Sequence, residues 1–129
     1  MFNTYIWLLL CMIFLHIIDD YKLQAGVLNC LKQKKWWRDQ PEYKDLYKND
    51  YVIGLIMHSF SWSFMIMLPI AFELYLNLGW LFLLYPINMI IHAIVDDLKA
   101  NKGKINLITD QIIHIVQILI TWSLFILYR

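Results

Sequence analysis

Residues 105–128 read INLITDQIIHIVQILITWSLFILY, a run of apolar side chains that only a few polar residues interrupt. A helix rises 1.5 Å per residue, so about 20 apolar residues cross the roughly 30 Å hydrocarbon core of a bilayer. Three further runs of this kind cover residues 2–18, 52–76 and 78–95. Because backbone groups in lipid must form hydrogen bonds within their own segment, each run predicts a membrane-spanning α-helix. We therefore expect an all-α fold in one domain, residues 1–129: a polytopic membrane protein with an antiparallel bundle of four transmembrane helices.

The overall composition agrees with this interpretation. Of the 129 residues, 60% are hydrophobic and 16% are charged, whereas soluble domains have roughly 45–50% apolar residues even with glycine counted. Eleven Lys and Arg residues against ten Asp and Glu residues leave a net charge of +1, which excludes the basic field of a nucleic-acid-binding protein. The first residues lack the basic start and the small-residue cleavage site of a secretory signal. We expect the first apolar run to remain in the mature protein.

The basic residues are distributed on one side of the predicted bundle. Seven lie in the connector 21–50 and three lie in residues 99–104, which leaves only Arg129 on the other side. Because basic residues concentrate in cytoplasmic loops, the connector 21–50 is predicted to be cytoplasmic and both termini to lie outside.

A basic and aromatic cluster, KKWWR at residues 34–38, lies within this connector. We interpret it as an interfacial anchor against anionic lipid headgroups, so the expected partner of this segment is membrane lipid. Pro41 and Glu42 are predicted to open a short surface helix through Tyr47, because proline is tolerated in a first helical turn.

Each apolar run contains one histidine. In an up-down-up-down bundle, the end of the first run, the start of the second, the end of the third and the start of the fourth lie on the cytoplasmic side. At 1.5 Å per residue, three of the histidines lie about 6 Å, and His58 about 10 Å, below the helix ends. We therefore expect one slab of imidazoles near the cytoplasmic face, made by His16, His58, His92 and His114.

Three of these histidines have a carboxylate four residues away, and residues at that spacing share a helix face. Ionisable groups at membrane depth are costly and normally face the bundle interior, so a cluster of them requires a neutralising partner. Imidazole and carboxylate ligands suit zinc, manganese or iron, and helical bundles can hold two such ions. We expect one or two divalent metal ions, held by His16, Asp20, His58, His92, Asp96, Asp110 and His114.

Any one of these pairs also has a structural interpretation, as a packing histidine or an interhelical hydrogen bond. Gln24, Lys99 and Gln111 adjoin the paired residues and are predicted to orient the ligands or to bind an anionic substrate. Asp19 and Asp97 are interpreted as helix-end charges at the interface. Four tryptophans are expected on outward faces, where they contact lipid or pack against the bundle: Trp7, Trp62, Trp80 and Trp122.

The segments HIIDDYKLQ at 16–24, HAIVDDLK at 92–99 and DQIIH at 110–114 together form a pattern. This pattern resembles the signature of a small bacterial and phage inner-membrane family, domain of unknown function 3307, over nearly the whole chain. That family is similar to membrane proteins described as metal-dependent hydrolases, which implies metal-bound His and Asp and a place in the bacterial cytoplasmic (inner) membrane. The resemblance carries over to His16, Asp20, Gln24, His92, Asp96, Lys99, Asp110, Gln111 and His114.

The leading functional hypothesis is an intramembrane metal-dependent hydrolase that acts at the cytoplasmic leaflet. Metal-activated water would attack a lipid-like ester or phosphoester, and Asp110 or Asp20 would serve as the catalytic general base. The alternatives use the same cluster differently, in a metal or proton transporter, a di-iron membrane oxidase or a bis-histidine haem protein. The scarcity of polar residues in the outer halves of the runs argues against transport.

Overall fold

The computed structural model describes residues 2–40 and 45–129, and every regular element among them is helical. Four helices are long: α1 (Phe2–Ile18), α4 (Tyr51–Glu73), α5 (Leu84–Ala100) and α6 (Leu107–Tyr128). The shorter elements are the π-helical turn η1 (Asp19–Leu23), α2 (Val27–Leu31), α3 (Lys34–Arg38) and the 3₁₀ turn η3 (Gly79–Leu83). No strand occurs in the described part of the chain, which confirms the predicted all-α class.

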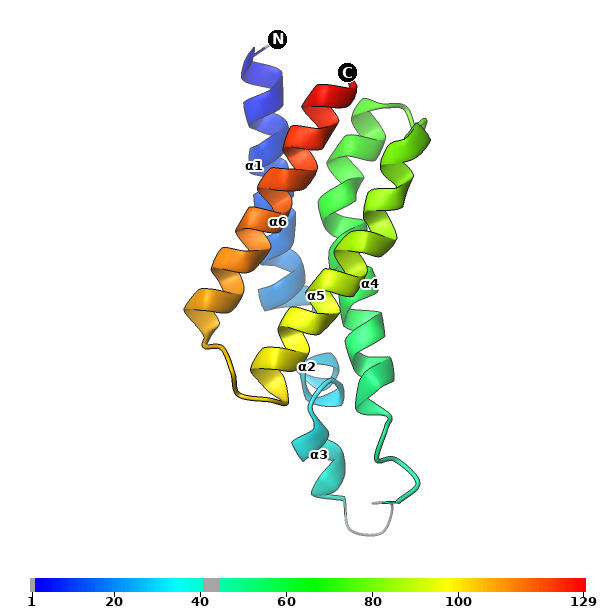
Figure 1. Cartoon of the computed structure of the whole chain (residues 1–129), viewed down its shortest axis with the longest axis vertical. Coiled ribbons are helices and arrows are strands. Elements are labelled where there is room, and N and C mark those ends of the chain that lie inside the picture. Colours follow the sequence, from blue (N-terminus) through cyan, green and yellow to red (C-terminus); the bar gives the residue numbers. More distant parts are fainter. Residues whose placement is uncertain (1, 41–44) are drawn as a thin grey trace.

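The long helices run alternately up and down, with both chain termini at one end of the bundle and α2 and α3 at the other (Figure 1). Helix α4 packs against α1 and α5, and α6 packs against α5 and α1, which closes the bundle. Three helical segments are long and apolar enough to cross a membrane: Tyr51–Glu73, Gly79–Ala100 and Leu107–Tyr128. Helix α1, with 17 residues, lies beside them.

Helix α4 ends three residues before the predicted end of the second run. The backbone N–H of Leu76 donates to the carbonyl of Ala71 at 2.7 Å, and the N–H of Tyr75 donates to that of Phe72 at 3.1 Å. These two bonds form a Schellman closure, which requires a left-handed residue. Tyr75 takes that conformation without being glycine, at φ 49°. The helix therefore turns early, and η3 leads the chain back into α5.

The two ends of the bundle interior differ in polarity. The apolar core lies toward the termini and includes Met12, Ile66, Ile70, Leu81 and Phe125. The buried histidines and aspartates lie in, or directly after, the halves of the long helices that are nearer to α2. Exposed apolar side chains cover the outer faces of the helices, among them Phe14, Phe64 and Ile120.

Helix α2 packs closely on α4 at Gly54. A Cβ atom at this position would lie 2.6 Å from the carbonyl carbon of Leu31, so only glycine allows the two backbones to approach this far. This contact fixes the residue that follows α2, Lys32, above the buried histidines. The KKWWR cluster forms α3, and the indole of Trp37 donates to the Leu31 carbonyl at 2.8 Å. The surface helix predicted from Pro41 begins outside the described residues, and residues 45–50 form turns.

Candidate metal centre

The four histidines lie on four different helices and meet in the bundle interior. His16 lies on α1, His58 on α4, His92 on α5 and His114 on α6, and all four are buried. The ring centroids of His92 and His114 are 4.1 Å apart, and those of His58 and His92 are 4.9 Å apart. His16 is 5.9 Å from His114. The helices thus place all four imidazoles in one contiguous cluster.

Two groups within this cluster have the composition of a metal site. One consists of Asp20, His58 and His92, and the other consists of His92, Asp96 and His114. In each group, the ligand atoms all lie within 4.8 Å of one another, a separation that a single bound ion can bridge. His92 belongs to both groups. It is therefore the central residue of the candidate centre.

His92 is completely buried, yet neither of its ring nitrogens has a hydrogen-bond partner within the described part of the chain. Nε2 of His92 lies 3.9 Å from Asp96 Oδ2, which is too far for a hydrogen bond. An unsatisfied buried polar group costs about 1–3 kcal/mol. A metal ion that accepts electron density from an imidazole nitrogen would remove this cost, so the residues present fit a bound cation.

Trp62 organises the deep side of the cluster. Its ring stacks on His92 at a centroid distance of 4.3 Å, and its Nε1–H donates to Nδ1 of His16 at 2.7 Å. The expectation that Trp62 faces outward is therefore wrong, because its side chain is fully buried. Trp62 fixes the tautomer of His16 and packs against the shared ligand candidate.

His16 is in contact with the cluster but belongs to neither triad. Its Nδ1 accepts from Trp62, and its Nε2 lies 3.1 Å from Oε1 of Gln111 and donates to it. The amide of Gln111 in turn donates to Asp20 Oδ2 at 3.3 Å and to Asp110 Oδ2 at 3.1 Å. Both nitrogens of His16 are thus used within the protein. This geometry gives His16 and Gln111 a positioning role toward the carboxylates.

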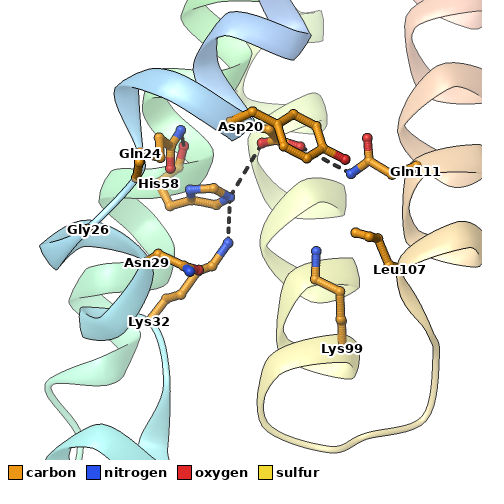
Figure 2. Close-up of a pocket in the computed structure, with 11 residues that line it drawn as sticks. Asp20, Gln24, Gly26, Asn29, Lys32, His58, Lys99, Leu107 and Gln111 are labelled. Atoms are coloured by element: carbon orange, nitrogen blue, oxygen red, sulfur yellow. Dashed lines mark hydrogen bonds and ion pairs between the residues drawn. The ribbon is translucent and has the colours of Figure 1, made fainter.

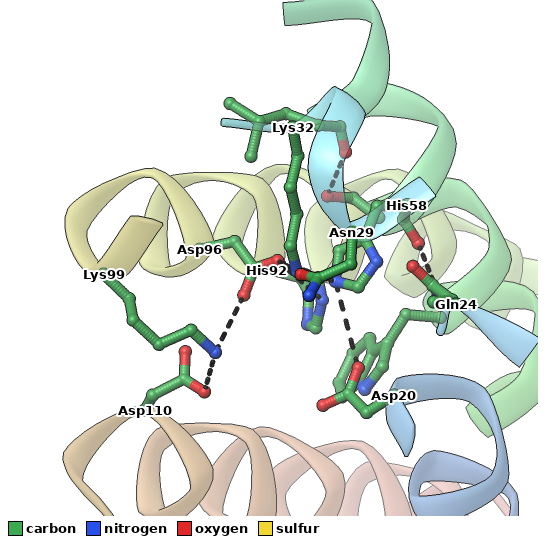
Figure 3. A network of polar contacts seen from close by, with 12 residues as sticks. Asp20, Gln24, Asn29, Lys32, His58, His92, Asp96, Lys99 and Asp110 are labelled. Carbon is green, nitrogen blue, oxygen red and sulfur yellow. Dashed lines mark hydrogen bonds and ion pairs between the residues drawn. The ribbon is translucent and has the colours of Figure 1, made fainter. Parts of the chain in front are cut away.

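Lys32 is a member of the cluster that the sequence motifs do not indicate. Its ammonium group is buried and lies 2.5 Å from Asp96 Oδ2 and 3.0 Å from His58 Nε2 (Figure 3). The same carboxylate oxygen is 2.6 Å from His58 Nε2. A lysine inserted from the connector thus contacts a residue of each triad. No spacing rule in the sequence could have found it, since its position depends on the packing of α2 against α4.

A second lysine, Lys99, bridges two carboxylates. Its Nζ lies 2.5 Å from Asp110 Oδ2 and 3.8 Å from Asp96 Oδ1 (Figure 3). Asp110 also lies 3.4 Å from Nε2 of His114. Asp110 is outside both triads, and it holds Lys99 at the edge of the cluster.

The consecutive carboxylates Asp19 and Asp20 take different environments. The interpretation of Asp19 as a helix-end charge at the interface is wrong, because its side chain is fully buried. It accepts hydrogen bonds from Ser61 at 2.5 Å and from Gln24. Burial raises the pKa of the Asp19 carboxyl. Gln24 also donates to the backbone carbonyl of His58 at 3.2 Å. Asp97, in contrast, pairs with Lys102 at 2.7 Å beyond the cluster.

The cluster opens toward the α2 end through a pocket of about 420 Å³. Asp20 and His58 from the first triad line it, and Lys32 and Lys99 approach it from different elements (Figure 2). Asp20 has one buried oxygen, Oδ1, without a hydrogen bond in the described structure. The pocket is therefore lined by a carboxylate, an imidazole and two lysine side chains.

Comparisons of the chain with family models, with curated proteins and with solved structures found no match. The resemblance to domain of unknown function 3307 thus stays a prediction from the three motifs.

Proposed function

We propose that the chain is a four-span protein of the bacterial cytoplasmic membrane, with the α2 end in the cytoplasm and both termini outside. Three segments are long and apolar enough to span, and α1 lies alongside them as an apolar helix of 17 residues. Ten of the eleven basic residues fall in the sequence segments 21–50 and 99–104, and the described parts of both segments lie at the α2 end. The positive-inside rule assigns that end to the cytoplasm.

Within this topology we propose an intramembrane metal-dependent hydrolase of lipid-like esters or phosphoesters. The observation that carries the proposal is the buried His92, which has no hydrogen-bond partner among the described residues and is shared by two His and Asp triads. The first of these triads lines an open pocket through Asp20 and His58. When bound there, a zinc, manganese or iron ion supplies Lewis-acid polarisation of the scissile group and lowers the pKa of water. His58, His92, His114 and Asp96 are the residues that would hold it.

Asp20 is the better placed of the two candidate general bases. Asp20 lines the pocket, whereas Asp110 does not line it and is held by Lys99. In hydrolysis of a phosphoester, the oxygen of water forms the new bond to phosphorus as the bond to the alcohol oxygen breaks. Asp20 takes the proton from water, and this proton passes to the departing alcohol.

Lys32 and Lys99 give the pocket its preference for an anion. An ammonium group has three donors, so each lysine can bind an anionic oxygen of an entering molecule. A phosphoester oxygen that enters the pocket meets both groups. This charge distribution favours a phosphoester over a neutral ester.

One observation favours metal transport as the second candidate. Buried polar residues continue along the α5–α6 seam beyond the histidines: Asn88 donates to Thr121 at 3.0 Å and accepts from Gln117 at 3.0 Å. Farther toward the termini, however, the interior consists of the apolar core that includes Leu84 and Phe125. This core leaves the seam closed on the outer side, so hydrolysis is the better-supported function.

The decisive experiment combines metal analysis with turnover. Detergent-purified wild-type protein should retain zinc, manganese or iron after desalting, and His92→Ala should lose it because both triads lose a ligand. His16→Gln is the matched control for metal content, since His16 belongs to neither triad. Release of phosphate from phosphatidic acid should follow the metal content. Full metal retention by His92→Ala would refute the centre, and metal-dependent uptake by vesicles without turnover would favour the transporter.

A further inference from the structure

An apolar groove of about 450 Å³ runs along the outer face of α6, next to the polar pocket. Its walls are almost entirely apolar, and its residues 108–116 rise about 12 Å along the helix. The side chains along it are exposed, as Ile112 is at 58%. The groove is lined by Tyr21, Leu107, Ile108, Gln111, Ile112, Ile115 and Val116.

The groove and the pocket adjoin each other. Three residues, Tyr21, Leu107 and Gln111, line both of them. Gln111 forms the boundary, because its amide group is hydrogen bonded to Asp20 and His16 on the side of the cluster. A molecule that lies in the groove therefore has its end at the carboxylate and lysines of the pocket.

The two compartments have complementary chemistry for one kind of molecule. The pocket presents the ammonium groups of Lys32 and Lys99, which attract an anionic oxygen. The groove presents isoleucine and valine side chains on a surface that faces lipid in the proposed topology. An amphipathic molecule with a phosphate at one end and a hydrocarbon chain at the other fits both compartments together, whereas free phosphate uses the pocket alone.

We infer that the groove on α6 binds an acyl chain of a glycerophospholipid whose phosphate occupies the pocket. The substrate then enters sideways from the bilayer between η1 and α6, and its headgroup reaches the cluster past Gln111. This inference rests on the proposed function, since it identifies the substrate class of the same site. The new elements are the groove, which binds the acyl chain, and the lateral route by which the lipid enters from the bilayer.

Binding of dioleoyl phosphatidic acid to the detergent-purified full chain, followed by native mass spectrometry, tests the inference. Ile112→Trp fills the groove, and Ile120→Trp is the matched control: the same helix, the same substitution and a similar exposure of 56%, but outside the groove. Loss of the buried methylene contacts should weaken binding about tenfold in Ile112→Trp, equivalent to about 1.4 kcal/mol. Ile120→Trp should bind as wild type does.

Dioleoylglycerol, which lacks the phosphate, should bind wild-type protein at least about tenfold more weakly than phosphatidic acid, because the lysines lose their partner. Equal affinities of the two tryptophan variants, or equal affinities of the two lipids, would overturn the inference. The measurement is made with added zinc and with a chelator, and the ratio between the variants should be the same in both. If the protein binds no metal, the proposed function is refuted. The ratio of the lipid affinities of the two tryptophan variants then still tests the groove.

Discussion

Replacement of Lys32 by methionine tests whether the buried ammonium group competes with the metal ion. Lys32 Nζ lies 2.5 Å from Asp96 Oδ2, an oxygen of the second triad. A zinc ion bound to that same oxygen at about 2.2 Å would lie no more than about 4.7 Å from the ammonium nitrogen. A divalent ion and the lysine therefore repel each other strongly unless the lysine moves away.

The magnitude follows from Coulomb's law. A double and a single positive charge about 4.7 Å apart repel each other by about 1.8 kcal/mol in a medium as polar as water, and by about 7 kcal/mol at an effective dielectric constant near 20. Lys32 can relieve part of this repulsion by swinging into the pocket, so we take the smaller energy as the minimum penalty that Lys32 imposes on zinc binding. Lys32→Met should therefore bind zinc at least about 20-fold more tightly than wild type.

Competition against a chromogenic chelator measures this affinity in detergent-purified protein. Lys35→Met is the matched control: it removes one charge from the same connector, but Lys35 is exposed on α3. The metal-free Lys32→Met protein should also melt below wild type, because Asp96 loses a buried partner, and zinc should restore more of its stability. A zinc affinity of Lys32→Met within about threefold of both wild type and the control would refute the competition.

Three further substitutions test the surroundings of the cluster by thermal unfolding in detergent. A carboxyl whose pKa is raised on folding stabilises the protein at low pH and loses that contribution as the pH rises through its folded-state value. Because the pKa of Asp19 is raised, Asp19→Asn should gain stability relative to wild type as the pH rises above about 4; a difference that does not change with pH would contradict this. Gly54→Ala should lower the melting temperature by about 5 °C or more through overpacking of α2 on α4, and it should weaken zinc binding less than His92→Ala does; an unchanged melting temperature would show that α2 is free to shift. Asn88→Ala should cost about 1–2 kcal/mol, since it removes the side-chain bonds to Thr121 and from Gln117, while metal content stays at the wild-type value; a loss of metal would make the α5–α6 seam part of the centre.

The helices and the depth of the histidines were predictable because general physics determines both. The thickness of a bilayer sets the length of an apolar run, and three such segments are present as long apolar helices. The rise of a helix sets the depth of a residue from the helix end, and the four histidines are buried side by side. Neither argument depends on which face of a helix a residue occupies.

The parts that could not be predicted depend on faces and on tertiary packing. A membrane helix is apolar on all sides, so the sequence could not show that Trp62 faces inward. The π-helical turn η1 changes the helical register after α1. As a result Asp19, the residue before Asp20, faces the protein interior. Lys32 reaches Asp96 across 64 positions of sequence, through a backbone contact at Gly54 that the spacing of charged residues does not reveal.

The charges around His92 decide between one ion and two. Asp20, Asp96 and Asp110 carry three negative charges, and Lys32 and Lys99 carry two positive charges within hydrogen-bond distance of two of these carboxylates. With the imidazoles neutral as ligands, the cluster has one net negative charge before metal binds. One divalent ion leaves a single net positive charge, which suits an anionic phosphoester, whereas two ions leave three uncompensated positive charges at a depth where each is costly. Because the two triads also share His92, we expect a content near one ion per chain, and a content near two in wild-type protein would require Lys32 and Lys99 to leave the cluster when metal binds.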